Sequence, residues 1–177
     1  MYVTGGQYKG ARVKIPDCAK PTLSKIREGV FNSLYSILGD FDNKIFLDLF
    51  SGSGIMSLEA LSRGFKTVSI DKNENAIRLI KENFKIAKTG FQIIKGDALK
   101  IIKNLEIMPD IIYIDPPWEI DYENIILTSF KKFKGSIIVI ESDKKRAREL
   151  FPIYGKISAP FREKIYGRCK IDFIKSP

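Results

Sequence analysis

The first 40 residues contain two different patterns of hydrophobic and polar positions. Residues 1–16 hold short β-like pieces around glycines, YVTGG and YKGARVKIP, which predict a β-hairpin or an extended arm. From Thr22 to Leu38 the apolar residues recur at intervals of three and four, which predicts a helix with one buried face. We therefore expect an N-terminal arm over residues 1–21 and one larger domain over residues 22–177.

Short apolar runs alternate with amphipathic stretches through the rest of the chain. The apolar runs predict strands at 45–50, 67–71, 91–97, 111–115 and 136–142. The stretches that follow them predict helices at 57–64, 73–88, 98–106, 121–134 and 144–150. Two last segments, 153–159 and 166–174, predict strands with no helix between them. The sequence thus predicts an α/β fold, with a doubly wound, mostly parallel seven-stranded sheet that ends in an antiparallel hairpin.

Length and composition limit the classes of protein that the chain can belong to. Its 177 residues are enough for one well-buried domain. We find no run of about eighteen apolar residues and no signal-peptide pattern, so we expect a cytoplasmic protein that does not enter a membrane. The absence of histidine excludes Ser-His-Asp and Cys-His catalysis and removes the commonest metal ligand. We therefore expect no metal, and we expect a monomer.

The formal net charge of +9 adds a candidate partner. A basic domain favours a polyanion, most simply nucleic acid, although a solvated lysine-rich surface would give the same composition. Basic residues are frequent in the N-terminal arm, where we expect Lys9, Arg12 and Lys14 to bind RNA.

An aspartate stands at the end of each of the first four predicted strands: Asp48, Asp71, Asp97 and Asp115. Ligands of doubly wound sheets bind outside the carboxyl ends of the strands, so these carboxylates should share one edge. Asp71 is placed to accept hydrogen bonds from both hydroxyls of a ribose. The alternative is that these aspartates cap helices, or, for Asp48, that the carboxylate is buried beneath the following loop.

A glycine-rich turn, SGSG, follows the first strand and opens a helix. Gly52 and Gly54 allow a ligand to approach the backbone, and the start of the helix supplies free N–H groups. A dinucleotide-binding pattern would place glycine or alanine at position 57, where this chain has Ser57. The acids Asp48 and Asp97 suit a cationic, amine-bearing ligand, and we therefore predict S-adenosylmethionine as the cofactor.

The stretch IIYIDPPWEI, residues 111–120, predicts the reacting group. Two prolines end the strand and hold the residues around them rigidly. Asp115 and the Pro116 carbonyl can accept hydrogens from an exocyclic amine of a base, and the carboxylate stabilises the charge that the nitrogen gains. Trp118 offers a stacking surface for a base taken out of its helix. We predict Asp115, Pro116, Pro117 and Trp118 as the catalytic group.

DPPW is similar to the [DNS]-P-P-[YFW] motif of amino-methyltransferases that modify adenine N6, cytosine N4 or guanine N2. With GGQYKG, KPTLSKIREGVFNSL and LDLFSGSGIMSLEALSRG in that order, essentially the whole chain resembles the RsmD family of ribosomal RNA guanine-N2 methyltransferases. The resemblance implies a Rossmann-like class I methyltransferase fold and S-adenosylmethionine as methyl donor. It also implies a guanine of 16S ribosomal RNA, free or in an assembling small ribosomal subunit, as the target.

The resemblance also implies roles for individual residues. The segment from Asp48 to Gly54 would contact the methionine moiety, Asp71 the ribose and Asp97 the adenine. The full set of expected cofactor-binding residues is Thr22, Arg27, Asp48, Phe50, Ser51, Gly52, Ser53, Gly54, Asp71, Lys72, Asp97, Ala98 and Asp115.

This chain departs from the family pattern at Lys20, Asp71 and Trp118, where arginine, glutamate and tyrosine or phenylalanine are usual. The tryptophan leaves the choice between guanine and adenine open, because it is frequent among adenine enzymes. An adenine-N6 methyltransferase, or a non-catalytic RNA-binding module with a vestigial cofactor pocket, remains the alternative.

Overall fold

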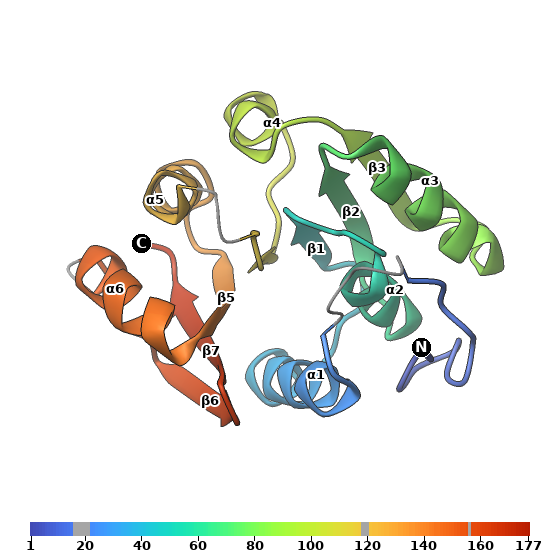
Figure 1. The fold of residues 1–177 in the computed structure, drawn as a ribbon, viewed down its shortest axis with the longest axis horizontal. Helices are drawn as coiled ribbons and strands as arrows, with labels where there is room; N and C mark the ends of the chain where they lie inside the picture. The colour runs from blue at the N-terminus through green and yellow to red at the C-terminus, as the bar shows by residue number, and fades with distance from the viewer. Residues whose placement is uncertain (16–21, 118–120, 156) are drawn as a thin grey trace.

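The computed structural model describes residues 1–15, 22–117, 121–155 and 157–177. In this part of the chain the strands form one seven-stranded sheet in the order β3-β2-β1-β4-β5-β7-β6 (Figure 1). The strands are β1 (Ile45–Asp48), β2 (Lys66–Asp71), β3 (Phe91–Lys95), β4 (Ile111–Ile114), β5 (Ile137–Asp143), β6 (Arg162–Tyr166) and β7 (Cys169–Lys175). The helices are α1 (Ser24–Leu38), α2 (Ile55–Ser62), α3 (Glu74–Asn83), α4 (Ala98–Asn104), α5 (Tyr122–Lys132) and α6 (Lys144–Tyr154), with a 3-10 turn at Phe84–Ile86.

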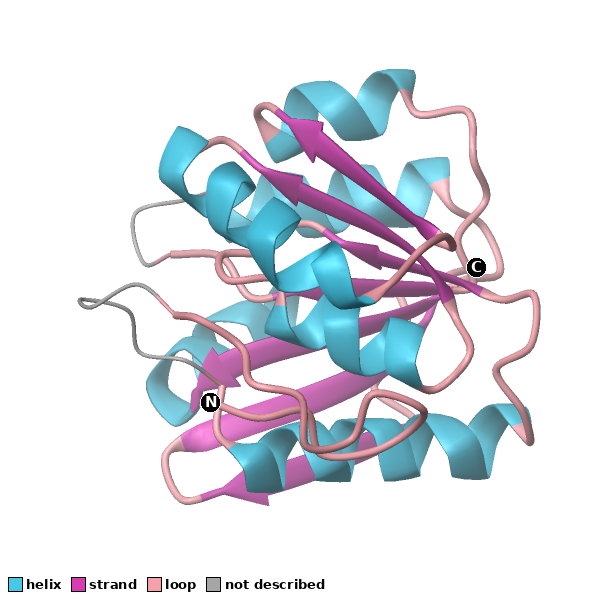
Figure 2. Cartoon of the chain, turned by 90° about the vertical axis from the view of Figure 1, so that its right-hand side faces the viewer, coloured by secondary structure: helices cyan, strands magenta, loops and turns pink. Residues whose placement is uncertain are grey.

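The five strands β1 to β5 are parallel, and β7 runs antiparallel to both β5 and β6. The predicted doubly wound sheet with a closing antiparallel pair is therefore confirmed. β1 lies between β2 and β4, so the chain builds the sheet outward from β1 in one direction and then in the other. The arrowheads of the parallel strands meet at one edge of the sheet (Figure 2). A crevice outside the ends of β1 and β4 is the expected ligand site.

Among the described residues, three helices cover each face of the sheet. The helices α1, α2 and α3 pack on one face, and α4, α5 and α6 pack on the other (Figure 1). Phe46 and Leu47, neighbours on β1, point to opposite faces and are both fully buried. Strands covered on both faces favour apolar residues at successive positions, which is why β1, β4 and the first four residues of β5 are nearly continuous apolar runs. No helix of the described residues is both long enough and apolar enough to cross a membrane.

The first strand of the closing hairpin does not lie where the sequence predicts it. The prediction of a strand at 153–159 is wrong: α6 continues through Pro152 to Tyr154, and β6 begins at Arg162. Leu150 and Tyr154 lie one helical turn apart and are both buried against the sheet, which favours the longer helix. The Tyr154 hydroxyl also donates a hydrogen bond to Asp172 Oδ2 on β7, at 2.6 Å.

The N-terminal arm forms the predicted hairpin over its described residues. Tyr2 pairs with Arg12 in an antiparallel bridge, and Val3 and Val13 are buried in the same core as α1 and α2. The division of the chain at residue 21 stays a prediction, because residues 16–21 lie outside the described part.

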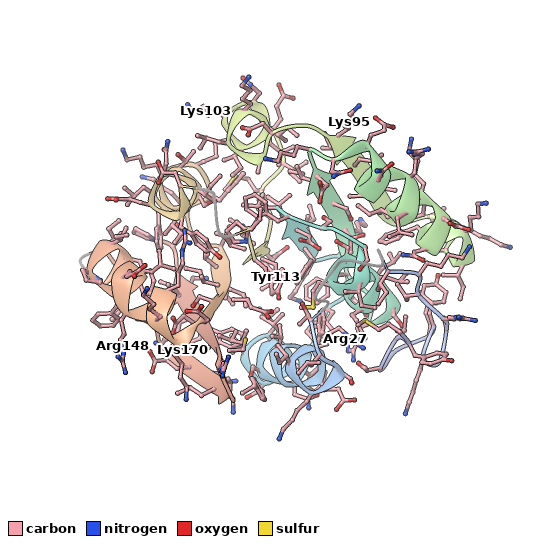
Figure 3. The ribbon with its side chains drawn as sticks, in the orientation of Figure 1. Arg27, Lys95, Lys103, Tyr113, Arg148 and Lys170 are labelled. Atoms are coloured by element: carbon pink, nitrogen blue, oxygen red, sulfur yellow. The ribbon has the colours of Figure 1, made fainter. Side chains whose placement is uncertain are left out.

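A buried carboxylate ties the arm to the helices on this face. Glu59 of α2 accepts hydrogen bonds from Arg27 Nε at 2.9 Å, from the Thr4 backbone N–H at 2.8 Å and from the Thr4 hydroxyl at 2.9 Å. Arg63, the residue that follows the end of α2, completes the ion-pair network. The side chains of Arg27 and Glu59 are 2% and 0% exposed, so neither charge is solvated. Figure 3 shows Arg27 between α1 and the arm.

We predict that Glu59→Gln destabilises the protein by about 3–5 kcal/mol, because it leaves the buried Arg27 guanidinium without a compensating charge. Urea unfolding measures this change. Glu82→Gln is the matched control, since Glu82 pairs with Lys14 at 2.6 Å on the surface and such pairs contribute about 1 kcal/mol or less. Equal unfolding midpoints for the two variants would contradict the prediction.

Candidate functional site

A cavity of about 740 Å³ opens at the carboxyl ends of the parallel strands. This volume lies in the range that holds small-molecule ligands and cofactors. Its wall includes ten of the predicted site residues: Thr22, Phe50, Gly52, Asp71, Lys72, Asp97, Ala98, Asp115, Pro116 and Pro117.

The glycine-rich loop after β1 is held tightly in place. Gly54 has a φ of +76°, and a Cβ atom there would lie 3.1 Å from Phe84 and 3.2 Å from Ile80. A larger residue would therefore be strained twice, by its backbone angle and by its neighbours. The Gly52 N–H donates a hydrogen bond to Asp71 Oδ2 at 2.8 Å, which joins the loop to the end of β2.

Asp71 keeps acceptor capacity toward the cavity. Its Oδ2 accepts from Gly52, and its Oδ1 accepts from the Asn73 backbone N–H at 2.8 Å. Each carboxylate oxygen can accept a second hydrogen bond. Two fixed acceptors side by side on a cavity wall match two neighbouring hydroxyl groups of a ribose.

Asp97 both caps a helix and lines the cavity. Its side chain accepts a hydrogen bond from the Lys100 backbone N–H at 3.0 Å, at the start of α4. The capping interpretation and the ligand-binding interpretation are therefore compatible, because only one oxygen is engaged.

Asp48 is buried beneath the loop and does not line the cavity. Its Oδ2 accepts a hydrogen bond from the Ser57 hydroxyl at 2.8 Å, which gives the serine at position 57 a structural role. Burial, and to a lesser degree the charge of Asp71, raises the pKa of Asp48 to about 7. Of the two positions expected for Asp48, the structure therefore has the one buried beneath the loop.

Asp115 follows the last residue of β4 and faces the cavity. Burial raises the pKa of Asp115 well above its usual range, and the carboxylates of Glu141 and Asp48 raise it further. The Pro116 carbonyl accepts a hydrogen bond from the Tyr122 hydroxyl at 2.9 Å, which fixes its direction and leaves its second lone pair open. Trp118 lies outside the described residues.

Asp48 is not the only predicted cofactor-binding residue that does not line the cavity. Four others do not line it either: Arg27, Ser51, Ser53 and Gly54. Arg27 affects the cavity only through its neighbours, because its guanidinium donates hydrogen bonds to the Thr22 and Tyr2 carbonyls. It therefore holds Thr22, which does line the cavity. In the described part of the chain, no group of three or more cysteine or acidic side chains is arranged to hold a metal ion.

Comparison with known proteins identifies the family. A family model described as "Conserved hypothetical protein 95" matches residues 1–175. Ribosomal RNA small subunit methyltransferase D of Buchnera aphidicola is 33% identical over 158 residues, which cover 83% of this chain and 80% of that protein. The chain belongs to the RsmD family.

A further relative and two solved structures are also similar to this chain. Ribosomal RNA small subunit methyltransferase D of Escherichia coli is 29% identical over 120 residues, which cover 66% of this chain and 59% of that protein. The solved structure of the Escherichia coli protein yhhF superposes with a TM-score of 0.86 at 22% identity, covering 99% of this chain and 97% of that one. A precorrin-6y C5,15-methyltransferase of Geobacter metallireducens reaches a TM-score of 0.72 at 17% identity, covering 93% and 94%. These structural likenesses confirm the Rossmann-like α/β fold.

The cavity of this RsmD family member has a second wall that the sequence did not predict. It comes from β5, α5 and the closing hairpin, and its residues include Tyr122, Glu141, Ser142, Asp143, Tyr166, Arg168 and Cys169. Glu141 lies on β5, two residues before the strand ends and level with the position of Asp115, so an acid near the end of the fifth predicted strand was the signal that could have found it. Tyr166 reaches α1 because Gly29 has no side chain: a Cβ atom there would lie 1.7 Å from the Tyr166 hydroxyl.

The raised pKa of Asp48 predicts a pH-dependent stability. A carboxyl group whose pKa rises from 3.8 in the unfolded chain to about 7 in the folded protein contributes stability below pH 3.8 that is lost as the pH rises through 7. We predict that Asp48→Asn, which keeps an acceptor for Ser57, reduces the fall in Tm between pH 5 and pH 8 relative to the wild type. Thermal unfolding at both pH values measures it, and an equal fall in both proteins would refute the assignment.

Proposed function

We propose that this protein transfers a methyl group from S-adenosylmethionine to the N2 amine of a guanine in small-subunit ribosomal RNA. The observation that carries the proposal is the convergence of Asp71, Asp97 and Asp115, from the ends of three strands, on one cavity of cofactor size. The relatives named as small-subunit ribosomal RNA methyltransferases support the same reaction and the same class of RNA.

The cavity fits the proposed cofactor group by group. Asp71 offers two oriented acceptors for the ribose hydroxyls, and Asp97 has a free oxygen for the amine of the adenine. Gly52 brings the backbone to the cavity surface, where the methionine moiety would lie. When bound, S-adenosylmethionine supplies a methyl group on a positively charged sulfur, and the surrounding carboxylates favour that charge.

We predict that Asp71→Asn raises the dissociation constant for S-adenosylmethionine about tenfold or more, because one charged acceptor of a ribose hydroxyl is lost. Titration calorimetry measures it. Asp121→Asn is the matched control: Asp121 caps α5 through the Asn124 backbone N–H at 3.1 Å and is not part of the cavity wall, so affinity should not change. Micromolar binding of NAD without any response to S-adenosylmethionine would contradict the cofactor proposal.

Asp115 and the Pro116 carbonyl are proposed to hold the target amine. A nitrogen that gains a methyl group also gains positive charge, which the Asp115 carboxylate stabilises. It then has to lose a proton, and the raised pKa of Asp115 makes this carboxylate a better proton acceptor than an ordinary aspartate. Tyr122 keeps the Pro116 carbonyl pointed in one direction. Pro117 would stiffen this segment, and Trp118 is proposed from the sequence alone as the stacking surface.

We predict that Asp115→Ala still binds S-adenosylmethionine but loses about 100- to 1,000-fold in the rate of methyl transfer, because a preorganised charge next to the reacting nitrogen is gone. Asp115→Asn keeps an acceptor oxygen and should lie between the wild type and Asp115→Ala. Single-turnover methyl transfer to small-subunit ribosomal RNA measures the rate. A near-normal rate in Asp115→Ala with cofactor bound would rule out this role.

The N-terminal arm is proposed as part of the RNA-binding surface. Lys9, Arg12 and Lys14 are exposed, while Val3 and Val13 anchor the arm in the core. Lys14 also pairs with Glu82, so its charge is shared between α3 and any phosphate. Exposed cations on an anchored segment can contact a phosphate backbone with little loss of chain entropy.

A further inference from the structure

We infer that Glu141 selects guanine by accepting a hydrogen bond from N1–H of the target base. Asp115, next to it, would accept from the N2 amine of the same base. This inference rests on the proposed function and adds a specificity-determining residue to it. It also addresses the choice between guanine and adenine, which the DPPW motif leaves open.

The register of the sheet places Glu141 next to Asp115. β4 and β5 are parallel neighbours whose ladder pairs Tyr113 with Val139 and Ile114 with Ile140, so Asp115 and Glu141 follow at the same level. Adjacent strands lie about 4.8 Å apart, and residues at one level point to the same face. Both residues line the cavity. The two carboxylates therefore form a pair of adjacent acceptors on one wall.

The Glu141 carboxylate is held in position by two neighbours. The Tyr113 hydroxyl, which lies at the centre of the molecule in Figure 3, donates a hydrogen bond to Oε2. The thiol of Cys169, a free cysteine on β7, lies 3.5 Å from Oε1 and is a weak donor. Each oxygen has a second lone pair, so the carboxylate is fixed in direction and can still accept a hydrogen bond from a ligand.

Two neighbouring carboxylates on one wall of a cavity favour a ligand edge that offers neighbouring donors. The Watson–Crick edge of guanine presents N1–H directly beside the N2 amine. Adenine presents an unprotonated N1, whose lone pair would face the Glu141 oxygen and repel it. Burial raises the pKa values of Glu141 and Asp115, because each carboxylate has given up part of its hydrogen bonding to water. Two N–H donors from guanine would replace the lost hydrogen bonds.

A substrate analogue separates base selection from chemistry. In 2-aminopurine the 2-amino group that receives the methyl remains, whereas N1 carries a lone pair instead of a hydrogen. Small-subunit ribosomal RNA would be assembled by ligation with guanine or 2-aminopurine at the position that the wild type methylates, mapped by mass spectrometry. The ratio of kcat/KM for guanine to kcat/KM for 2-aminopurine measures the selection.

We expect this ratio to be about 100 or more in the wild type and to fall at least about tenfold in Glu141→Gln. The glutamine amide can donate to N1 of 2-aminopurine through its nitrogen and accept from guanine through its oxygen. Glu163→Gln is the matched control and should keep the wild-type ratio, because Glu163 is an exposed residue of β6 that pairs with Lys170.

Each remaining outcome overturns a defined statement. If the wild type forms N2-methylguanosine and Glu141→Gln keeps the wild-type ratio, this inference is overturned and the proposed function stands. Equal loss of turnover on both substrates in Glu141→Gln also overturns it, since Glu141 would then serve chemistry and not selection. If the wild type forms no N2-methylguanosine in small-subunit ribosomal RNA, the proposed function fails and this inference fails with it.

Discussion

The positions of the N-terminal arm, α1 and α2 depend on the hydrogen bonds and ion pairs of one buried carboxylate, Glu59. It joins the arm, α1 and α2 through Thr4, Arg27 and Arg63, so three segments far apart in sequence share one charge. Arg27 then extends the network to the Thr22 carbonyl at the cavity. A buried charge has no solvent to replace a lost partner, so each segment is required for the others to keep their positions. The arm is thus structurally coupled to the cavity, although it forms no part of the cavity wall among the described residues.

The distribution of charge separates two kinds of ligand. The chain carries a net charge of +9, yet the cavity gathers carboxylates from the ends of β2, β4 and β5. In the proposed function, the basic exterior would attract an anionic RNA, whereas the acidic cavity would favour a cationic sulfonium and the N–H edge of a base. Burial keeps the acids poorly solvated, and this is why their pKa values rise and why donors of hydrogen bonds would bind well there.

Most of the fold could be predicted from the sequence because each layer repeats one simple pattern. Apolar strands alternate with one-sided helices, and the aspartates at the strand ends mark the ligand edge. Three features depend on contacts between distant segments. The extent of α6 depends on Tyr154 reaching Asp172, a contact between segments that no local pattern encodes. For Asp48 the sequence leaves two positions open, on the cavity wall or buried beneath the loop, and the hydrogen bond from Ser57 that accompanies the buried position is seen only in the structure. The second cavity wall depends on tertiary packing in the same way, since Tyr166 can reach α1 only at Gly29.

The pairing of β5 with β7 has a consequence for synthesis of the protein on the ribosome. The first four residues of β5, Ile137 to Ile140, are apolar, and one of its two edges is covered only by β7, which is made about thirty residues later. Until β7 emerges, the nascent sheet has an open edge with unpaired backbone groups, which is prone to aggregation. Chaperones shield surfaces of this kind. The cavity is also incomplete in that interval, because the hairpin that supplies Tyr166, Arg168 and Cys169 has not yet docked. A partly made chain would therefore be vulnerable to aggregation and without activity at the same time.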